Sequence, residues 1–148
     1  MIEKDNIILE VKDLKLHFPI HRGLLQRVVG HVKAVDGVSF KLRDGEVLGL
    51  VGESGCGKTT LGRSILQLIK PTSGEILLDG KDLTQINKEV LRNMRKDLQI
   101  VFQDPYGSLN PRITIGDAIL EPLKVHSVLA NNKQRKEKVM ELLEKVSL

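Results

Sequence analysis

Apolar and polar residues alternate in two short stretches near the start of the chain, Leu14–Phe18 and Val38–Leu42. The apolar stretch Ile7–Val11 before them also predicts a strand. A period of two is typical of strands with one buried and one solvated face. Arg43–Gly45 follows as a turn signal. The pattern therefore predicts an antiparallel β portion over residues 1–45.

The segment between the second and third of these strands has a different character. Residues 19–32 begin with a proline and carry basic residues and glycines around a Leu-Leu pair. Because proline cannot donate to a sheet ladder, Pro19 is predicted to end the preceding strand. We expect residues 19–32 to form a surface excursion between strands rather than an element of their own.

Two further segments are almost wholly apolar and predict strands buried on both faces. Glu46–Val51 and Leu98–Phe102 have the composition of middle strands in a parallel sheet that helices cover. Glu75–Leu78 predicts a shorter strand, closed by the hairpin-type turn Asp79-Gly80. Apolar spacing predicts helices at Lys58–Ile69, Leu83–Arg95, Ile115–Leu120 and Lys133–Val146. Together these elements indicate an α/β fold.

Composition indicates the general class of protein but not its function. The chain has 148 residues, of which 41% are hydrophobic and 28% charged, as in a soluble domain with one core. It has no apolar run of the roughly 18 residues that span a bilayer, and its first residues lead us to expect no secretory signal. The single cysteine, Cys56, leaves no internal disulfide framework. The net charge of +4 indicates ordinary solubility, and only 3% aromatic residues leave little for base stacking, so we expect no nucleic-acid partner.

A glycine-rich loop between a predicted strand and a predicted helix carries the chemistry. Its residues fit the pattern of a glycine, any four residues, then Gly-Lys-Ser/Thr: Gly52, Glu53, Ser54, Gly55, Cys56, Gly57, Lys58 and Thr59. This position between strand and helix is the context that the motif requires. The sequence therefore predicts a loop that binds the phosphates of a nucleoside triphosphate, most simply Mg-ATP.

Each residue type in the loop has a physical role. Gly55 and Gly57 let backbone N–H groups approach phosphate oxygens, and the start of the helix adds its positive dipole end. Lys58 supplies a full positive charge for the terminal phosphates, Thr59 a hydroxyl for Mg²⁺, and Thr60 can reach the inner phosphate. The alternative is a glycine turn that only caps a structural helix. For Cys56, a reactive thiol near a helix N-terminus competes with a small residue that faces out of the loop.

Three motifs together resemble the ATP-binding subunit of ABC transporters. They are Gly52–Thr60, Pro71–Ile76 with Asp79-Gly80, and Ile100–Pro105. The stretch Phe102–Arg112 is similar to the oligopeptide/dipeptide importer branch, as is the excursion at residues 19–32. The resemblance begins near Leu9 and covers nearly all of the chain.

The resemblance implies roles for individual residues. Phe18 matches the aromatic residue that stacks on adenine, although it could instead be a core residue at a strand end. Residues 52–60 match the phosphate loop, with Lys58 as a catalytic residue and Thr59 as a metal ligand. Gln103 matches the glutamine that senses Mg²⁺ and the γ-phosphate, which makes it both catalytic and metal-binding. The loop after Gln103 is implied to face a membrane subunit.

The resemblance also implies a division of the chain. Residues 46–103 correspond to the P-loop core, and residues 104–148 to the glutamine loop and the start of a helical subdomain that is not completed. The signature motif, the catalytic glutamate, the switch histidine and some flanking strands of the family lie beyond the position of Leu148. We therefore expect an N-terminal part of an ABC nucleotide-binding domain, inactive in hydrolysis by itself.

For the complete protein the resemblance implies an ATPase that energises peptide import. Its partners would be transmembrane permease subunits and a second ATP-binding subunit, at the cytoplasmic face of the membrane as a peripheral protein. Other possibilities stay open at this point: a P-loop kinase or GTPase, a non-catalytic nucleotide-binding module, and a DNA-repair ABC ATPase. The sequence shows neither the Asn-Lys-x-Asp of GTPases nor an arginine-rich kinase lid. Substrate identity and homo- or heterodimerisation are not encoded in these motifs.

Overall fold

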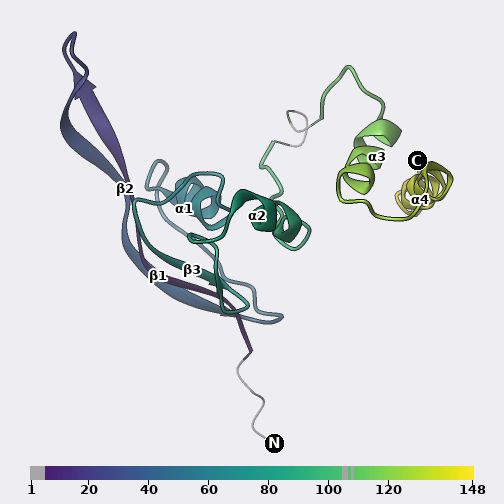
Figure 1. The fold of residues 1–148 in the computed structure, drawn as a ribbon, viewed down its shortest axis with the longest axis horizontal. Helices are drawn as coiled ribbons and strands as arrows, with labels where there is room; N and C mark the ends of the chain where they lie inside the picture. The colour runs from purple at the N-terminus through teal and green to yellow at the C-terminus, as the bar shows by residue number, and fades with distance from the viewer. Residues whose placement is uncertain (1–5, 105–106, 108) are drawn as a thin grey trace, which may run out of the picture. The chain divides into compact units, whose positions relative to one another are not determined.

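The structure is a computed structural model that describes residues 6–104, 107 and 109–148 (Figure 1). The chain divides into two compact units, Met1–Arg92 and Asn93–Leu148. The first unit holds the sheet, one helix and most of a second, and the second unit holds a further pair of helices. Within the described residues no helix is both long and apolar enough to cross a bilayer.

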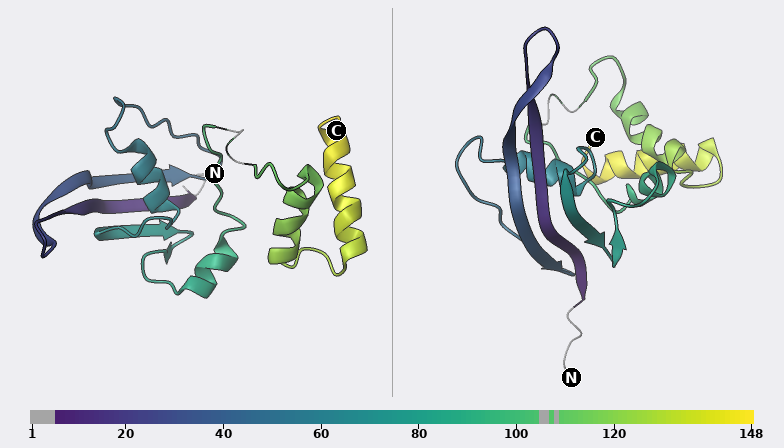
Figure 2. Two further views of the ribbon diagram at one scale, coloured as in Figure 1. Left: turned by 90° about the horizontal axis from the view of Figure 1, so that it is seen from above. Right: turned by 60° about the vertical axis from the view of Figure 1, so that its left-hand side comes forward.

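The first unit is built on a four-stranded antiparallel sheet (Figure 2). Its strands are β1 (Ile7–Arg22), β2 (Arg27–Arg43), β3 (Ser73–Leu78) and β4 (Lys81–Asp82), in the spatial order β2-β1-β3-β4. The prediction of an antiparallel β portion at the start of the fold is therefore confirmed, and β3 and β4 extend the sheet with residues beyond position 45.

A bulge in β1 explains why two predicted strands form one. The register with β2 shifts between Val11 and Leu14, where Asp13 takes a positive φ of 43°. An extra residue in a strand reverses its facing pattern. As a result Val11, Leu14 and Leu16 are all buried. They form the core of this unit with residues from β2, β3, the turn after β4 and α1 (Lys58–Ile65): Val35, Ile76, Leu83 and Leu61.

The predicted end of a strand at Pro19 is wrong. β1 continues through Pro19, which pairs with His31, and ends at Arg22. Residues 19–32 are thus the outer part of a β1–β2 hairpin, although they do lie on the surface as expected. β1 pairs with β3 only as far as Lys15, so beyond that point it has a single partner strand. Proline is tolerated in such an edge position, where an N–H is not needed on both sides.

The turn between β3 and β4 follows the sequence prediction. Leu78 pairs with Lys81, leaving Asp79 and Gly80 as a two-residue loop. Both have positive φ, 47° and 75°. This is the backbone that a tight hairpin requires, and it suits an Asp-Gly pair.

The two predicted strands at 46–51 and 98–102 are wrong for the chain as it stands. Neither segment is a strand, and neither pairs with any described strand. Their side chains are largely in solvent: Val47 is 94%, Val51 91% and Val101 97% exposed. An apolar run can be buried as a strand only where neighbouring strands bond to its backbone on both sides. The described residues supply no such neighbours.

Within the described residues, each predicted helix is present, but not every boundary agrees. They are α1, α2 (Lys88–Met94), α3 (Ile115–Val125) and α4 (Asn132–Lys145). The helix predicted from Leu83 starts only at Lys88, because Asp82 accepts hydrogen bonds from the Thr84 N–H and hydroxyl and holds a turn there. Leu83 is nevertheless buried, at 2% exposure.

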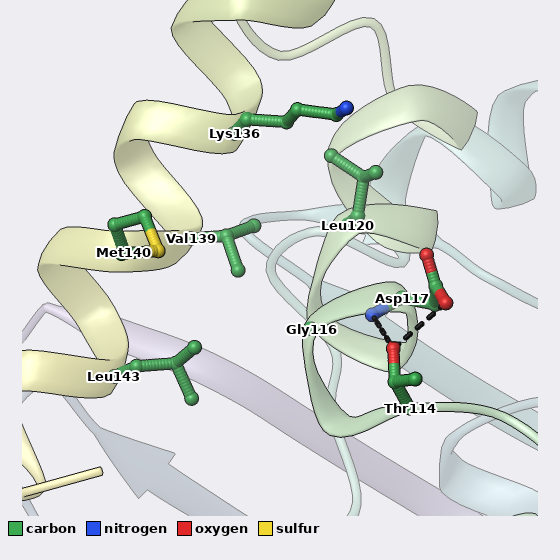
Figure 3. Close-up of a pocket in the computed structure, with 8 residues that line it drawn as sticks. All are labelled: Thr114, Gly116, Asp117, Leu120, Lys136, Val139, Met140 and Leu143. Carbon is green, nitrogen blue, oxygen red and sulfur yellow. Dashed lines mark hydrogen bonds between the residues drawn. The ribbon is translucent and has the colours of Figure 1, made fainter.

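The second unit is a pair of capped helices. Thr114 caps α3 by accepting from the Asp117 N–H, and Asn131 caps α4 by accepting from the Gln134 N–H. Leu120 and Val139 are buried between the two helices. Figure 3 shows the pocket there, about 250 Å³, with Met140 and Leu143 also on its wall. Its lining is mostly apolar, so it is a packing feature and carries no evident chemistry.

The exposed apolar segments predict that the purified chain self-associates. Unpaired backbone groups beside apolar side chains readily pair with other chains. We expect sedimentation velocity to show species larger than the monomer, and Val47→Lys with Val101→Lys to shift the distribution toward monomer. Val146→Lys, at a position 64% exposed outside both segments, is the matched control. A monodisperse monomer with strong amide protection across residues 46–51 and 98–102 would contradict this expectation.

Candidate functional site

The N-terminus of α1 is open to an external anion. α1 begins at Lys58, its N-cap is Gly57, no side chain caps it, and its first turn has no acidic residue. By contrast, side chains occupy the N-termini of α3 and α4. The first N–H groups of a helix have no partner within the helix, and they lie at its positive dipole end. The end of α1 is therefore suited to bind a phosphate.

A close backbone contact fixes the loop beside the sheet. Gly57 has a φ of 96°, and a side chain there would overlap the Ala34 carbonyl oxygen of β2. At the other end of the loop, a Cβ on Gly52 would lie 2.7 Å from Cys56 Sγ. Only glycine fits these two positions without a shift. The sheet thus determines where α1 starts and how the loop curls before it.

Lys58 folds back across the loop. Its Nζ donates to the carbonyl oxygens of Gly52 at 2.7 Å and Glu53 at 2.6 Å, and lies 3.6 Å from Cys56 Sγ. An ammonium has three N–H donors, and sulfur is a weak acceptor. A phosphate oxygen could therefore replace the thiol contact while both carbonyl bonds persist. This arrangement places a full positive charge beside the open end of α1.

A cleft of about 360 Å³ lies between this loop and β2. Its charged lining is Lys33, Asp36 and Lys58. Asp36 accepts from Lys33 Nζ at 3.0 Å and bonds His17 Nε2 at 2.9 Å. The Lys33 hydrogen bond, followed by that of His17, lowers the pKa of the Asp36 carboxyl. Asp36 is thus engaged with its own partners, and Lys58 is the charge that faces a ligand at the loop.

The residues present fit Mg²⁺ bound together with phosphates rather than a metal cage. Among the described residues there is no group of three or more His, Cys, Asp or Glu able to hold an ion. Mg²⁺ commonly takes only one or two protein ligands and completes its shell with water and phosphate oxygens. Thr59 is the second residue of α1 and is exposed, so its hydroxyl is available for such a role.

The predicted site residues are divided between the two units. Residues 52–60 form one loop and helix start in the first unit. Phe18 is in β1 opposite Val32 and is 41% exposed, which does not fit a buried core side chain. Gln103 is exposed and belongs to the second unit, so its association with the loop stays a prediction. Within the stretch 102–112, Pro105, Tyr106 and Ser108 lie outside the described residues.

Sequence reasoning missed the contribution of β2 to this site. Ala34 supports Gly57 from behind, and Lys33 and Asp36 form a wall of the cleft. These residues precede the loop by about twenty positions and carry no motif. Their role depends on the position of β2 beside the start of α1, and no local sequence pattern predicts that position.

Cys56 provides a direct probe of the loop. Cys56 is the chain's single cysteine and is exposed, and its Sγ lies 3.6 Å from Lys58 Nζ. We expect Mg-ATP to slow its labelling by a maleimide, because phosphates beside Lys58 would cover the sulfur. A Cys56→Ser, Ser127→Cys chain, labelled at a position outside the loop, is the control that nucleotide should not protect. Equal labelling of Cys56 with and without nucleotide would count against phosphate binding here.

Comparison with known proteins agrees with this geometry. Residues 35–148 match the family described as ABC transporter. The chain is 55% identical over 142 residues to the oligopeptide transport ATP-binding protein AppF of Bacillus subtilis, covering 95% of this chain and 43% of that protein. It is 50% identical over 141 residues to the glutathione import ATP-binding protein GsiA of Pectobacterium atrosepticum, covering 95% of this chain and 22% of that one.

Solved structures agree in fold. A dimeric post-hydrolysis state of the ATP-binding cassette MJ0796, bound to ADP and phosphate, superposes with a TM-score of 0.74 at 24% identity. The alignment covers 95% of this chain and 57% of that one. The chain thus spans less than half the length of these two curated relatives and just over half of this cassette. Since the family match extends over most of its residues, the chain belongs to the ABC transporter family.

Proposed function

We propose that residues 52–60 bind the phosphates of Mg-ATP, and that the complete protein hydrolyses ATP to drive import of peptides across a membrane. The observation that carries the proposal is the uncapped N-terminus of α1 with the Lys58 ammonium beside it. The names of the relatives, an oligopeptide transporter and a glutathione importer, support a peptide substrate.

The proposed residues divide the work of phosphoryl transfer. Lys58 and the N–H groups at the start of α1 hold the terminal phosphates and stabilise the charge that develops as water attacks the γ-phosphorus in line. Mg²⁺ would add further charge neutralisation, with Thr59 and Gln103 as its protein ligands. The Gln103 amide can also orient the attacking water, because it both donates and accepts. Phe18 would stack on the adenine.

The assembly proposed is that of a peripheral ATPase. The loop after Gln103 would contact permease subunits at the cytoplasmic face of the membrane, and a second ATP-binding subunit would complete each site. A solved neighbour described as dimeric supports this second partner. A non-catalytic nucleotide-binding module is the main alternative, and it would bind ATP without turnover even as a complete protein.

Nucleotide binding by the 148-residue chain tests the proposal. We expect saturable, Mg²⁺-dependent binding of a fluorescent ATP analogue, competed by unlabelled ATP, with no phosphate release above background. Positioning supplies most of the catalysis in phosphoryl transfer, so half of a site should bind but not turn over. Absence of binding would overturn the phosphate-loop assignment. Turnover that Lys58→Ala abolishes would instead refute the requirement for a second subunit.

A further inference from the structure

The β1–β2 hairpin carries a net positive charge. Residues 14–35 contain no Asp or Glu, and their four basic residues account for a charge equal to the net +4 of the whole chain: Lys15, Arg22, Arg27 and Lys33. Lys15 and Lys33 pair with Asp13 and Asp36 at the base of the hairpin. Among the described residues, no ion pair is formed by the two arginines farther out. The outer hairpin is therefore a cationic surface.

The end of the hairpin is also strongly apolar. The turn between β1 and β2 exposes Leu24 at 105% and Leu25 at 76%, and the first residues of β2 expose Val28 at 52% and Val29 at 57%. The hairpin extends away from the rest of the first unit beyond its contact with β3 (Figures 1 and 2). Among the described residues of this unit, nothing covers these side chains. Large exposed apolar groups gathered in one place mark an interaction site more often than a passive surface.

Arg22 and Arg27 stand directly opposite each other as the last pair before the turn. Like charges in a cross-strand pair destabilise a hairpin. A two-stranded hairpin is marginal in water in any case. The pair makes physical sense where an external anion lies between or beside the two guanidinium groups, which bind phosphate well.

The outermost groups of the hairpin follow the order of groups at a bilayer surface. The leucines are outermost and the arginine pair follows them, with the exposed Val28 and Val29 next on β2. At a membrane the acyl chains are innermost and the phosphates of the headgroups surround them. Apolar area and basic residues together give binding to anionic lipid. A protein partner with an acidic groove could pair with the arginines, but it would also have to offer an apolar surface to Leu24 and Leu25.

We propose that the tip of the β1–β2 hairpin, residues 20–29, docks on the surface of an anionic lipid bilayer. Leu24 and Leu25 enter the boundary between headgroups and acyl chains, and Arg22 and Arg27 bind lipid phosphates. This contact is independent of nucleotide binding, since its residues are not those of the phosphate loop. It gives the chain a membrane contact of its own, besides any contact made through permease subunits.

Flotation of the 148-residue chain with vesicles tests the proposal and separates bound protein from aggregates, which sink. We expect the chain to float with phosphatidylcholine vesicles that contain phosphatidylserine, and much less with phosphatidylcholine alone. Arg22→Gln with Arg27→Gln should weaken binding roughly 25-fold, from about fivefold for each basic residue at an anionic surface. Lys88→Gln with Lys133→Gln removes the same charge elsewhere. Because it changes only the overall charge of the protein, vesicle binding should stay within about twofold of that of the parent chain.

A tryptophan introduced at the tip gives an independent measurement, because the chain contains none. Leu25→Trp should shift its emission to shorter wavelength on adding anionic vesicles and be quenched by brominated acyl chains. Val146→Trp, on an exposed position of the second unit, should do neither. Leu24→Ser with Leu25→Ser should lose most flotation while retaining the circular dichroism of the parent chain, since both side chains are in solvent.

Three results would overturn the proposal. One is equal flotation with neutral and anionic vesicles, and another is equal loss in the arginine pair and its lysine control. The third is no flotation together with a change in the monomer–dimer distribution in the Leu24→Ser, Leu25→Ser chain, which would assign the tip to a second copy of this chain instead of a lipid surface.

Discussion

Lys58→Ala is expected to abolish binding of Mg-ATP while leaving the fold intact. Lys58 is the one charged side chain that lies across the loop, and it is held there by the Gly52 and Glu53 carbonyl oxygens. A hydrogen bond to a charged group is worth about 1.5–3 kcal/mol, and this ammonium would also neutralise phosphate charge. We therefore expect a loss of at least about 100-fold in affinity. Titration with a fluorescent ATP analogue at fixed Mg²⁺ measures it.

The control for this variant is Lys70→Ala, which removes the same charge from an exposed position after α1. It should bind nucleotide as the parent chain does. Both variants should keep the parent circular dichroism, because the carbonyls that Lys58 leaves behind lie in an exposed loop and can bond to water. Undiminished affinity in Lys58→Ala would remove the phosphate-loop assignment altogether.

The parts of the fold that sequence predicted are those in which local chemistry decides the backbone. Asp79-Gly80 forms a hairpin turn because both residues accept positive φ. The strand alternation at Leu14 and Leu16 leads to burial directly. The loop before α1 was located because its glycines and Lys58 form a motif whose spacing is itself a geometric requirement. In each case the cause lies within a few residues of the effect.

The parts that sequence missed depend on partners distant in the chain. The apolar run at 46–51 correctly indicates a need for burial, but a run does not specify which strands will cover it. Without such strands Val47 and Val51 lie in solvent. The prediction at Pro19 was wrong because it also depends on a distant strand. Proline ends a strand where its missing N–H would have bonded to a neighbouring strand. β3 pairs with β1 only as far as Lys15, so β1 has no second neighbour at Pro19.

The support that β2 gives to the loop leads to the second large effect: Gly57→Ala should destabilise the chain and abolish nucleotide binding together. A Cβ at this position would overlap the Ala34 carbonyl oxygen, and the φ of 96° is one that residues with side chains rarely adopt. The left-handed backbone alone costs roughly 1–2 kcal/mol. Relieving the overlap requires the loop to move off β2, so we expect a total loss of about 3 kcal/mol or more in the free energy of unfolding.

Gly62→Ala is the matched control, because it makes the same chemical change five residues later. Gly62 lies inside α1, and a Cβ there meets nothing within 4 Å. Alanine in a helix interior is favoured over glycine by about 1 kcal/mol, so this variant should be stabilised and should bind nucleotide normally. Both substitutions restrict the unfolded chain equally, so the difference between them isolates the native surroundings. Urea unfolding followed by circular dichroism, at concentrations low enough to limit self-association, should give shifts of opposite sign. Shifts of the same sign and size would mean that the contact between Gly57 and Ala34 does not hold the loop in place.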